Sequence, residues 1–279
     1  MLPSEPATIT GHGSGCLTLW ARLDKVRPMA GSVSADAYVD ALAPLIARVS
    51  EQTPAVEKAA DLVVASVRDD GVLQTFGSGH SEALAMELAG RAGGLVPSNR
   101  ISLRDVVIFG GESTDVLSRG VLERDPAVAQ KLYDLAAPHE ADVFVIASNS
   151  GVNGSIVEMA QIVKERGHPL IAITSVTQST DLESRHPSGS KLSDHADVLL
   201  DNCAPYGDAV LDLPGGGKVC AVSSITASLL AQMLTAEIVG RLAAAGETPP
   251  VYLSANIPGG DEHNHAVERR YEGRIRRTA

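Results

Sequence analysis

The chain has 279 residues, of which 44% are hydrophobic and only 3% aromatic, and its 23 basic and 34 acidic residues give a net charge of −11. This acidic balance disfavours nonspecific binding to DNA, RNA or an anionic membrane surface, so we expect no nucleic acid and no membrane as a partner. Because aromatic residues are so few, Ala, Val, Leu and Ile must build the core. That composition suits helices packed on a parallel sheet.

The three cysteines, Cys16, Cys203 and Cys220, have neither a disulfide framework nor a metal-like spacing. Such cysteine usage is typical of a reducing cytosol, so we expect a cytoplasmic protein with no bound metal. No apolar run reaches the roughly 18 residues that a membrane span needs. We also expect no signal peptide, because no basic segment leads into an apolar core near the first residue.

The N-terminal part predicts a leader followed by two helices. Residues 1–28 contain scattered Gly, Pro, Ser and Thr and are expected to be disordered. Within residues 29–70, Ser34 has the character of an N-cap for a first helix, which Pro44 interrupts and is expected to kink. Thr53 is the expected cap of a second helix, because a proline follows it at the first helical position.

From residue 71 to 245, apolar runs typical of strands alternate with helix-forming segments. The sequence therefore predicts an α/β fold, a doubly wound, mainly parallel five-stranded sheet flanked by helices, within a single domain of residues 29–279. A polar C-terminal arm, 246–279, follows this core. The expected strands are 72–76, 143–147, 170–174 and 197–200, with one more at either Leu95-Val96 or 106–109. The expected helices are 81–91, 126–137, 154–165 and 219–245. Residues 176–193 are expected to form a loop.

Two Gly/Ser turns follow predicted strands at equivalent places. Gly77-Ser78-Gly79-His80-Ser81 comes after the first strand, and Ser148-Asn149-Ser150-Gly151 comes after a later one. A helix-forming segment follows each turn, so backbone N–H groups, the helix dipole and hydroxyls together favour an anion. Thr174 and Ser175 also end a strand, where open α/β sheets place their ligands. The two turns predict one pocket that holds a phosphorylated small molecule from two sides.

These turns resemble the pattern of the sugar isomerase (SIS) domain, Gly-x-Gly-x-Ser after the first strand and Ser-x-Ser-Gly-x-Thr after a later one. The second turn departs from it, because Asn153 stands where the family has Thr; its amide still donates, with altered geometry. Roughly residues 30–275 are similar to a bacterial subgroup of stand-alone SIS proteins related to phosphoheptose isomerases. The segments that carry this similarity are Phe-Gly-Ser-Gly-His-Ser at 76–81, Arg-Ala-Gly-Gly-Leu at 91–95, Ser-Arg-His-Pro-Ser-Gly at 184–189, Ala-Asp-Val with Asp-Asn at 196–202, and Gly-Asp-Glu-His-Asn at 260–264.

The resemblance implies which residues hold a sugar phosphate. In SIS domains the serine equivalent to Ser81 contacts the phosphate, and a plain helix N-cap is the alternative role. Arg185 and His186, in the expected loop, are further candidates to reach the phosphate. The expected substrate-binding residues are Gly77, Ser78, Gly79, His80, Ser81, Ser148, Asn149, Ser150, Gly151, Asn153, Ser155, Thr174 and Ser175.

An aldose–ketose isomerase needs a base that moves a proton between two neighbouring sugar carbons, and a group that opens the ring; carboxylates and imidazoles suit both tasks. Glu87 is the first candidate base, because its segment resembles the Glu-bearing segment of phosphoheptose isomerases. Glu82 is its rival, and an ion pair with Arg91 one helical turn on is the structural alternative for Glu87. His263 is the candidate acid or ring-opening residue, since the resemblance implies a His or Lys from the C-terminal part, often of a neighbouring subunit.

The resemblance thus implies a phosphosugar-binding protein, most simply a sugar-phosphate isomerase, that needs no cofactor and assembles as a homodimer or homotetramer. The nearly uncharged helix 219–245 is a candidate subunit interface. A non-catalytic phosphosugar sensor and a phosphosugar etherase or deaminase stay open, because fold alone does not separate these chemistries. The sensor is disfavoured, since the residues before the first strand are acidic and lack a basic recognition helix.

Overall fold

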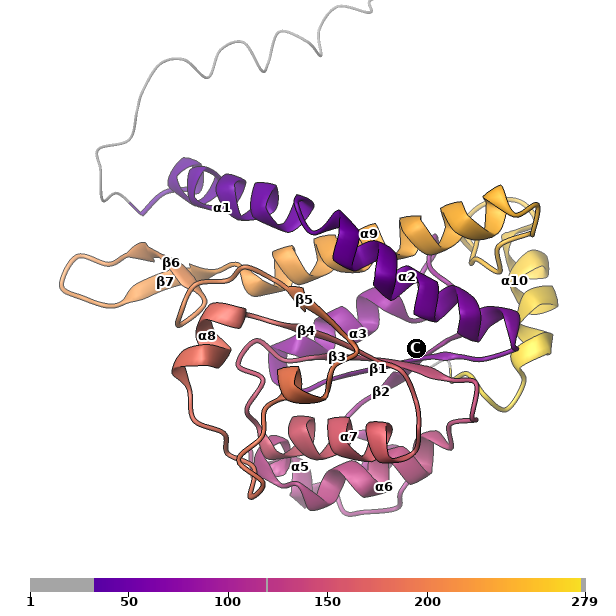
Figure 1. Ribbon diagram of the computed structural model, residues 1–279, viewed down its shortest axis with the longest axis horizontal. Helices are drawn as coiled ribbons and strands as arrows, with labels where there is room; N and C mark the ends of the chain where they lie inside the picture. The colour runs from indigo at the N-terminus through magenta and orange to yellow at the C-terminus, as the bar shows by residue number, and fades with distance from the viewer. Residues whose placement is uncertain (1–32, 119, 277–279) are drawn as a thin grey trace, which may run out of the picture.

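The computed structural model describes residues 33–118 and 120–276 (Figure 1), so the expected leader 1–28 lies outside the described residues. Helix α1 (Ala35–Ser50) begins as predicted, with the Ser34 hydroxyl accepting from the backbone N–H of Ala37 at 3.1 Å. Helix α2 (Thr53–Arg68) starts one residue earlier than predicted, with Gln52 in the N-cap position. The Thr53 hydroxyl donates back to the carbonyl of Ser50 and caps nothing.

Five parallel strands form the sheet in the order β2-β1-β3-β4-β5, which confirms the predicted fold class. The central strands are buried on both faces because their residues are almost all apolar. β1 pairs with β3 up to Gly77 opposite Ala147, so these two strands end at the same edge of the sheet. The bounds are β1 (Leu73–Gly77), β2 (Ser98–Ile101), β3 (Val143–Ala147), β4 (Leu170–Thr174) and β5 (Val198–Asp201).

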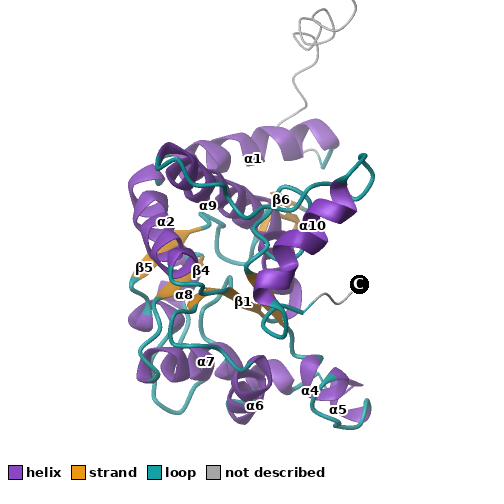
Figure 2. Ribbon diagram, turned by 90° about the vertical axis from the view of Figure 1, so that its right-hand side faces the viewer, coloured by secondary structure: helices purple, strands orange, loops and turns teal. Residues whose placement is uncertain are grey.

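Helices cover both faces of this sheet (Figures 1 and 2). On one face α2, α3 (Glu82–Leu88) and α9 (Ser223–Ala244) share a buried apolar cluster with the strands. On the other face α6 (Ala127–Ala136) and α7 (Gly154–Glu165) form a second cluster. The chain therefore leaves β1 towards one face and β3 towards the other, which opens a crevice between the ends of these two neighbouring strands.

Helix α9 is the one helix in the described ranges that is long and apolar enough to cross a membrane by length and composition, so the sequence-based expectation of no such run was wrong. It packs within the molecule, where eight of its residues, including Leu230 and Leu234, are buried. A core helix meets the same criteria as a membrane span. Packing against α2 and α3 accounts for these eight buried residues.

The second strand in the chain was predicted wrongly. Neither expected segment forms a strand of the sheet: Leu95 makes an isolated bridge with Val251, and Asp105–Ile108 forms the short helix α4. β2 instead contains the buried polar residues Ser98 and Asn99. These polar side chains make hydrogen bonds with neighbouring groups, so an edge strand forms although its sequence has no apolar run.

Two other segments also differ from the prediction. The expected loop 176–193 begins with helix α8 (Val176–Asp181), which the Ser175 hydroxyl caps by accepting from the Gln178 N–H at 3.1 Å. The expected start of the long helix is instead strand β7 (Lys218–Ala221), which pairs with β6 (Ala209–Asp212) in an antiparallel hairpin. Three glycines with positive φ, at 215–217, make its turn, and this conformation favours glycine.

The C-terminal arm packs at the edge of the sheet where the strands begin. The backbone of Val251 and Tyr252 bonds to the 93–96 segment, and helix α10 (Gly260–Glu268) follows. Further on, the Arg274 guanidinium pairs with the buried carboxylate of Asp142. Figure 1 accordingly shows α10 at one end of the molecule, and α8 with the β6–β7 hairpin at the other.

We expect His168 to make stability fall in mild acid. It is 2% exposed; Nδ1 lies 3.0 Å from the Asp142 carbonyl, to which it must donate, so Nε2 accepts from the Tyr133 hydroxyl at 2.8 Å. Burial lowers the pKa of His168 below its usual 6.5. Below about pH 6.5 the unfolded chain therefore binds a proton that the folded chain rejects, so this stability is present above that pH and lost beneath it.

Urea unfolding of wild type and His168→Gln between about pH 5.5 and pH 8 measures this effect. The free energy of unfolding of wild type should fall more steeply as the pH is lowered than that of the variant. The difference between the two slopes should approach the value for the uptake of one proton on unfolding. A constant difference between the two proteins across this range would contradict the assignment.

Candidate functional site

The first Gly/Ser turn leaves β1 at the crevice. Ser78 is extended and buried, Gly79 takes a positive φ of 58°, and His80 and Ser81 complete a 3₁₀ turn. Ser81 occupies the N-cap position of α3 without a capping hydrogen bond. Its hydroxyl has no partner within residues 33–118 and 120–276, so the simple cap that the sequence allowed is not formed.

The second turn leaves β3 beside the first. The Ser148 hydroxyl accepts from the N–H of Gly151 at 3.1 Å and so closes the turn. Gly151 has a φ of 67°, and a Cβ there would lie 3.1 Å from both the Ser179 and Thr174 hydroxyls. Asn149 is held on both sides, accepting from Asn202 at 2.9 Å and donating to Gln178 at 2.8 Å. The turn is thus fixed by its neighbours, while the Ser150 hydroxyl has no partner in the described part of the chain.

The two turns face each other across a small cavity. Its volume of about 20 Å³ accommodates a single water-sized polar group. Its lining comes from the ends of β3 and β4, from the residues that follow β1, β3 and β5, and from the starts of α3 and α9. The cavity therefore lies at the carboxyl ends of the strands, where their order reverses. It is lined by His80, Ser81, Leu84, Ala147, Ser148, Asn149, Ile173, Asn202, Ser223, Ser224 and Ala227.

A larger hollow adjoins this cavity through His80, which lines both. Its volume of about 420 Å³ is that of a small-molecule site. Glu82 is one of its two lining carboxylates, accepting from the Ser102 hydroxyl at 2.8 Å and lying 3.9 Å from the Arg100 guanidinium. The other lining residues are Gly79, Leu103, Arg104, Leu117, Gly120, Leu122 and Glu123.

Several predicted binding residues support the turns and do not line the cavity. The Thr174 hydroxyl donates to the Asn149 carbonyl at 3.2 Å, and the Ser175 hydroxyl donates to the Ala204 carbonyl at 2.6 Å. The Ser155 hydroxyl donates to the Glu123 carbonyl at 2.9 Å, which ties α7 to the rim of the larger hollow. Asn153 precedes α7 and accepts from Arg185 at 2.8 Å.

The two predicted catalytic residues lie away from the cavity in the same chain. Glu87 pairs with Arg91 and accepts from Gln232 of α9 at 2.6 Å, which is the structural alternative that the sequence allowed. His263 lies on α10 and donates from Nε2 to the Val251 carbonyl at 3.0 Å. Since α10 packs at the opposite edge of the sheet, a second copy of the chain would have to bring His263 to the cavity.

Sequence reasoning missed Asn202, Ser223 and Ser224 as cavity residues. Asn202 follows β5 directly, and its place after a strand was the signal that could have found it. The two serines begin α9, and the expected helix start at residue 219 hid them inside a helix. Within the described ranges, no cluster of three or more His, Cys, Asp or Glu side chains is placed to hold a metal ion.

The fold and its crevice define a doubly wound α/β protein with two serine-containing turns at the strand-order switch. Residues 37–175 match the family model described as SIS domain. The chain is 42% identical to a UPF0309 protein of Listeria monocytogenes, over 80% of this chain and 91% of that protein. It is 35% identical to a UPF0309 protein of Caldanaerobacter subterraneus, over 86% and 98%. The chain belongs to the SIS-domain proteins, within the UPF0309 family.

Solved structures are similar to this chain at low identity. The phosphoheptose isomerase from Neisseria gonorrhoeae is 19% identical, with a TM-score of 0.45, over 74% of this chain and 100% of that chain. The Vibrio vulnificus NanR protein, complexed with ManNAc-6P, is 14% identical, with a TM-score of 0.47, over 76% of this chain and 64% of that chain.

Proposed function

We propose that this chain binds a phosphosugar in the crevice between β1 and β3 and interconverts its aldose and ketose forms. One observation carries this proposal: His80 and Ser81 of the first turn line the same small cavity as Ser148 and Asn149 of the second. Two separate turns of an SIS domain thus meet at one point, where open α/β sheets bind their ligands.

The phosphate would be held by hydroxyl and backbone donors that the fold leaves available. Ser81 and Ser150 carry hydroxyls without partners in the described residues, and one phosphate oxygen fits the small cavity between the turns. The first N–H groups of α7, a twelve-residue helix, add the positive end of its dipole. This set of neutral donors binds an anion although the chain as a whole is acidic.

The sugar itself would occupy the larger hollow, where Glu82 and His80 face it together. A carboxylate and an imidazole are the two groups that proton transfer between neighbouring carbons requires. Glu82 therefore replaces Glu87 as the first candidate base, because Glu82 lines the hollow, whereas Glu87 is bonded to Gln232 of α9. In this scheme the chemistry needs no cofactor.

His263 would act only in an assembly. In a homodimer or homotetramer a second copy would place α10 over the crevice, as the SIS resemblance implies for a C-terminal histidine. The cytoplasm is the compartment we propose, since sugar phosphates are made and used there.

We expect Ser81→Ala to lose much of the phosphosugar affinity. Removing a hydrogen bond to a charged group costs about 1.5–3 kcal/mol, or roughly 10- to 150-fold in Kd. Thermal unfolding with glucosamine 6-phosphate, ManNAc-6P and arabinose 5-phosphate, each beside its unphosphorylated sugar, measures this. Ligand at 100 times its Kd adds about 2.7 kcal/mol of stability to wild type, and the gain should require the phosphate.

Ser50→Ala is the matched control, because Ser50 lies on α1 and donates only within its own helix, to the Ile46 carbonyl. It should respond to each ligand as wild type does. A wild-type chain that no phosphosugar stabilises would refute the proposed function, and equal shifts in Ser81→Ala would remove Ser81 from the site.

A further inference from the structure

The loop that carries Ser-Arg-His-Pro-Ser-Gly packs directly on the second turn. The backbone N–H of Arg185 donates to the Val152 carbonyl at 2.9 Å, and the N–H of Leu192 donates to the Gly151 carbonyl at 2.9 Å. In addition, the Arg185 Nη1 donates to the Asn153 Oδ1 at 2.8 Å. The loop is therefore joined to the turn at three consecutive residues, the last of which stands where the SIS pattern has Thr.

The contact between Arg185 and Asn153 fixes which way the amide faces. A guanidinium has five N–H donors and no acceptor, so it can hold an asparagine only by its oxygen. The Asn153 Nδ2 must then point away from Arg185. In the described part of the chain Nδ2 has no partner, although the residue is only 9% exposed. The fully buried side-chain atoms without partners there are Ser179 Oγ and Tyr271 Oη, so Nδ2 is reachable from solvent.

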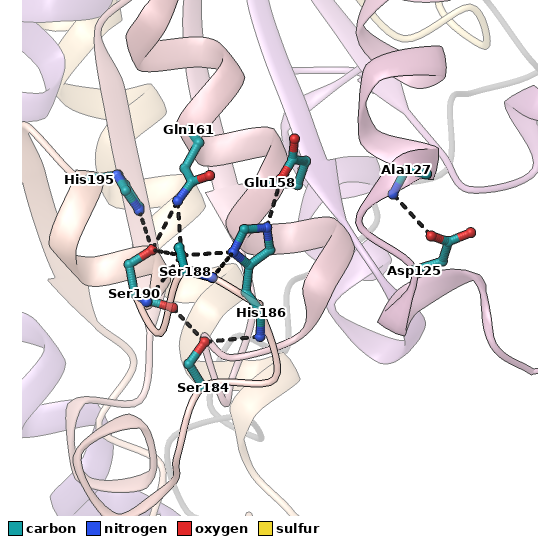
Figure 3. Close-up of polar contacts among 9 residues, drawn as sticks. All are labelled: Asp125, Ala127, Glu158, Gln161, Ser184, His186, Ser188, Ser190 and His195. Atoms are coloured by element: carbon teal, nitrogen blue, oxygen red, sulfur yellow. Dashed lines mark hydrogen bonds and ion pairs between the residues drawn. The ribbon is translucent and has the colours of Figure 1, made fainter.

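The next residue, His186, fixes the backbone of the loop that carries Arg185. The His186 side chain is 6% exposed, with Nε2 2.6 Å from Glu158 Oε2 and Nδ1 2.7 Å from the Ser188 hydroxyl (Figure 3). Gln161 donates to the hydroxyls of Ser188 and Ser190 at 3.0 and 3.1 Å.

Glu158 and Gln161 both lie on α7, which begins one residue after Asn153. The same helix thus sets the position of Asn153 and that of the loop that carries Arg185. The exposed Arg185 side chain is therefore carried by a backbone that is joined both to the second turn and to α7.

We propose that Arg185 is a positioning residue that orients the Asn153 amide so that Nδ2 donates to the phosphate of a bound sugar phosphate. This role rests on the proposed function. A threonine hydroxyl rotates freely to find a phosphate, whereas an unrestrained amide presents its oxygen as readily as its nitrogen. An oxygen facing a phosphate repels it, and Arg185 prevents that orientation.

A double-mutant cycle tests this role, with Kd for inorganic phosphate and for glucosamine 6-phosphate measured by calorimetry. In the wild-type background Arg185→Met should weaken binding about three- to tenfold, because phosphate binding must then immobilise the Asn153 side chain that Arg185 no longer orders. In an Asn153→Thr background the same change should alter Kd less than about twofold, because no amide remains to be oriented. Arg68→Met is the matched control, since Arg68 is exposed and pairs with Glu247 at the opposite edge of the sheet.

Each other outcome overturns the role. Equal losses in both backgrounds would show that Arg185 contacts the phosphate itself, and no loss in either would show that the amide needs no orientation. If Asn153→Thr binds too weakly for the cycle, NMR of the Asn153 side-chain amide replaces it. The signal is assigned with Asn153→Asp, and it must shift when phosphate is added to wild type. If the wild-type chain binds neither probe, the proposed function is overturned. If the wild-type chain binds and Arg185→Met binds equally well, only the role of Arg185 is overturned.

Discussion

Gly77→Ala is expected to abolish phosphosugar binding, because the new methyl group would occupy the backbone of the first turn. A Cβ at this position would lie 2.3 Å from the carbonyl oxygen of Ser81 and 2.6 Å from its carbon. Backbone atoms cannot rotate aside as a side chain does, so the turn that carries His80 and Ser81 must move. Overpacking of this kind costs about 1–3 kcal/mol of stability, and it displaces the donors of the cavity.

Calorimetric titration with the phosphosugar that stabilises wild type measures the loss, and circular dichroism shows whether the variant is folded. Gly240→Ala is the matched control. Gly240 lies in α9 with nothing within 4 Å of its Cβ position, so alanine should leave binding unchanged and raise stability slightly. If folded Gly77→Ala keeps the wild-type Kd, the first turn does not hold the ligand.

The sequence predicted strands well where burial leaves a clear pattern. β3 and β4 have the predicted bounds, because strands covered on both faces must be apolar throughout. β2 escaped prediction because its polar residues are satisfied by partners distant in sequence: the Asn99 amide donates to Gln74 at 2.9 Å, and Gln74 donates in turn to Asp142. No local pattern records such a network, since it exists only once β1, β2 and β3 lie together.

The lining of the candidate cavity was predicted in part, again because a sequence records only local features. Ser81, Ser148 and Asn149 were identified because Gly/Ser turns after strands are local features, and the sheet brings them to one cavity. Glu87 was predicted to be the catalytic base from its sequence context alone. Glu82 and Glu87 are five residues apart, so a helix turns about 140° between them and they cannot share a face. Only the packing of α3 on α9 decides which of the two meets the crevice.

We expect Glu82→Gln to abolish turnover while phosphosugar binding persists. Glutamine keeps the size of the side chain and an oxygen that accepts from Ser102, but it cannot take a proton from carbon. Loss of a general base typically lowers kcat by about 10²- to 10⁴-fold. Proton NMR in heavy water measures the step directly, because the base exchanges the proton it abstracts with solvent deuterium during each aldose–ketose cycle.

Glu87→Gln is the matched control on the same helix. Its carboxylate pairs with Arg91 and Gln232, outside both the cavity and the larger hollow, so exchange should continue at close to the wild-type rate. Loss of exchange in Glu87→Gln with full exchange in Glu82→Gln would assign the base to Glu87, and would require a crevice completed by a second copy of the chain. Tight binding without exchange in wild type would identify a phosphosugar-binding protein without isomerase activity. Exchange that depends on Glu82 would place the base on the first turn of α3, where the fold brings a carboxylate beside the phosphate-binding turns.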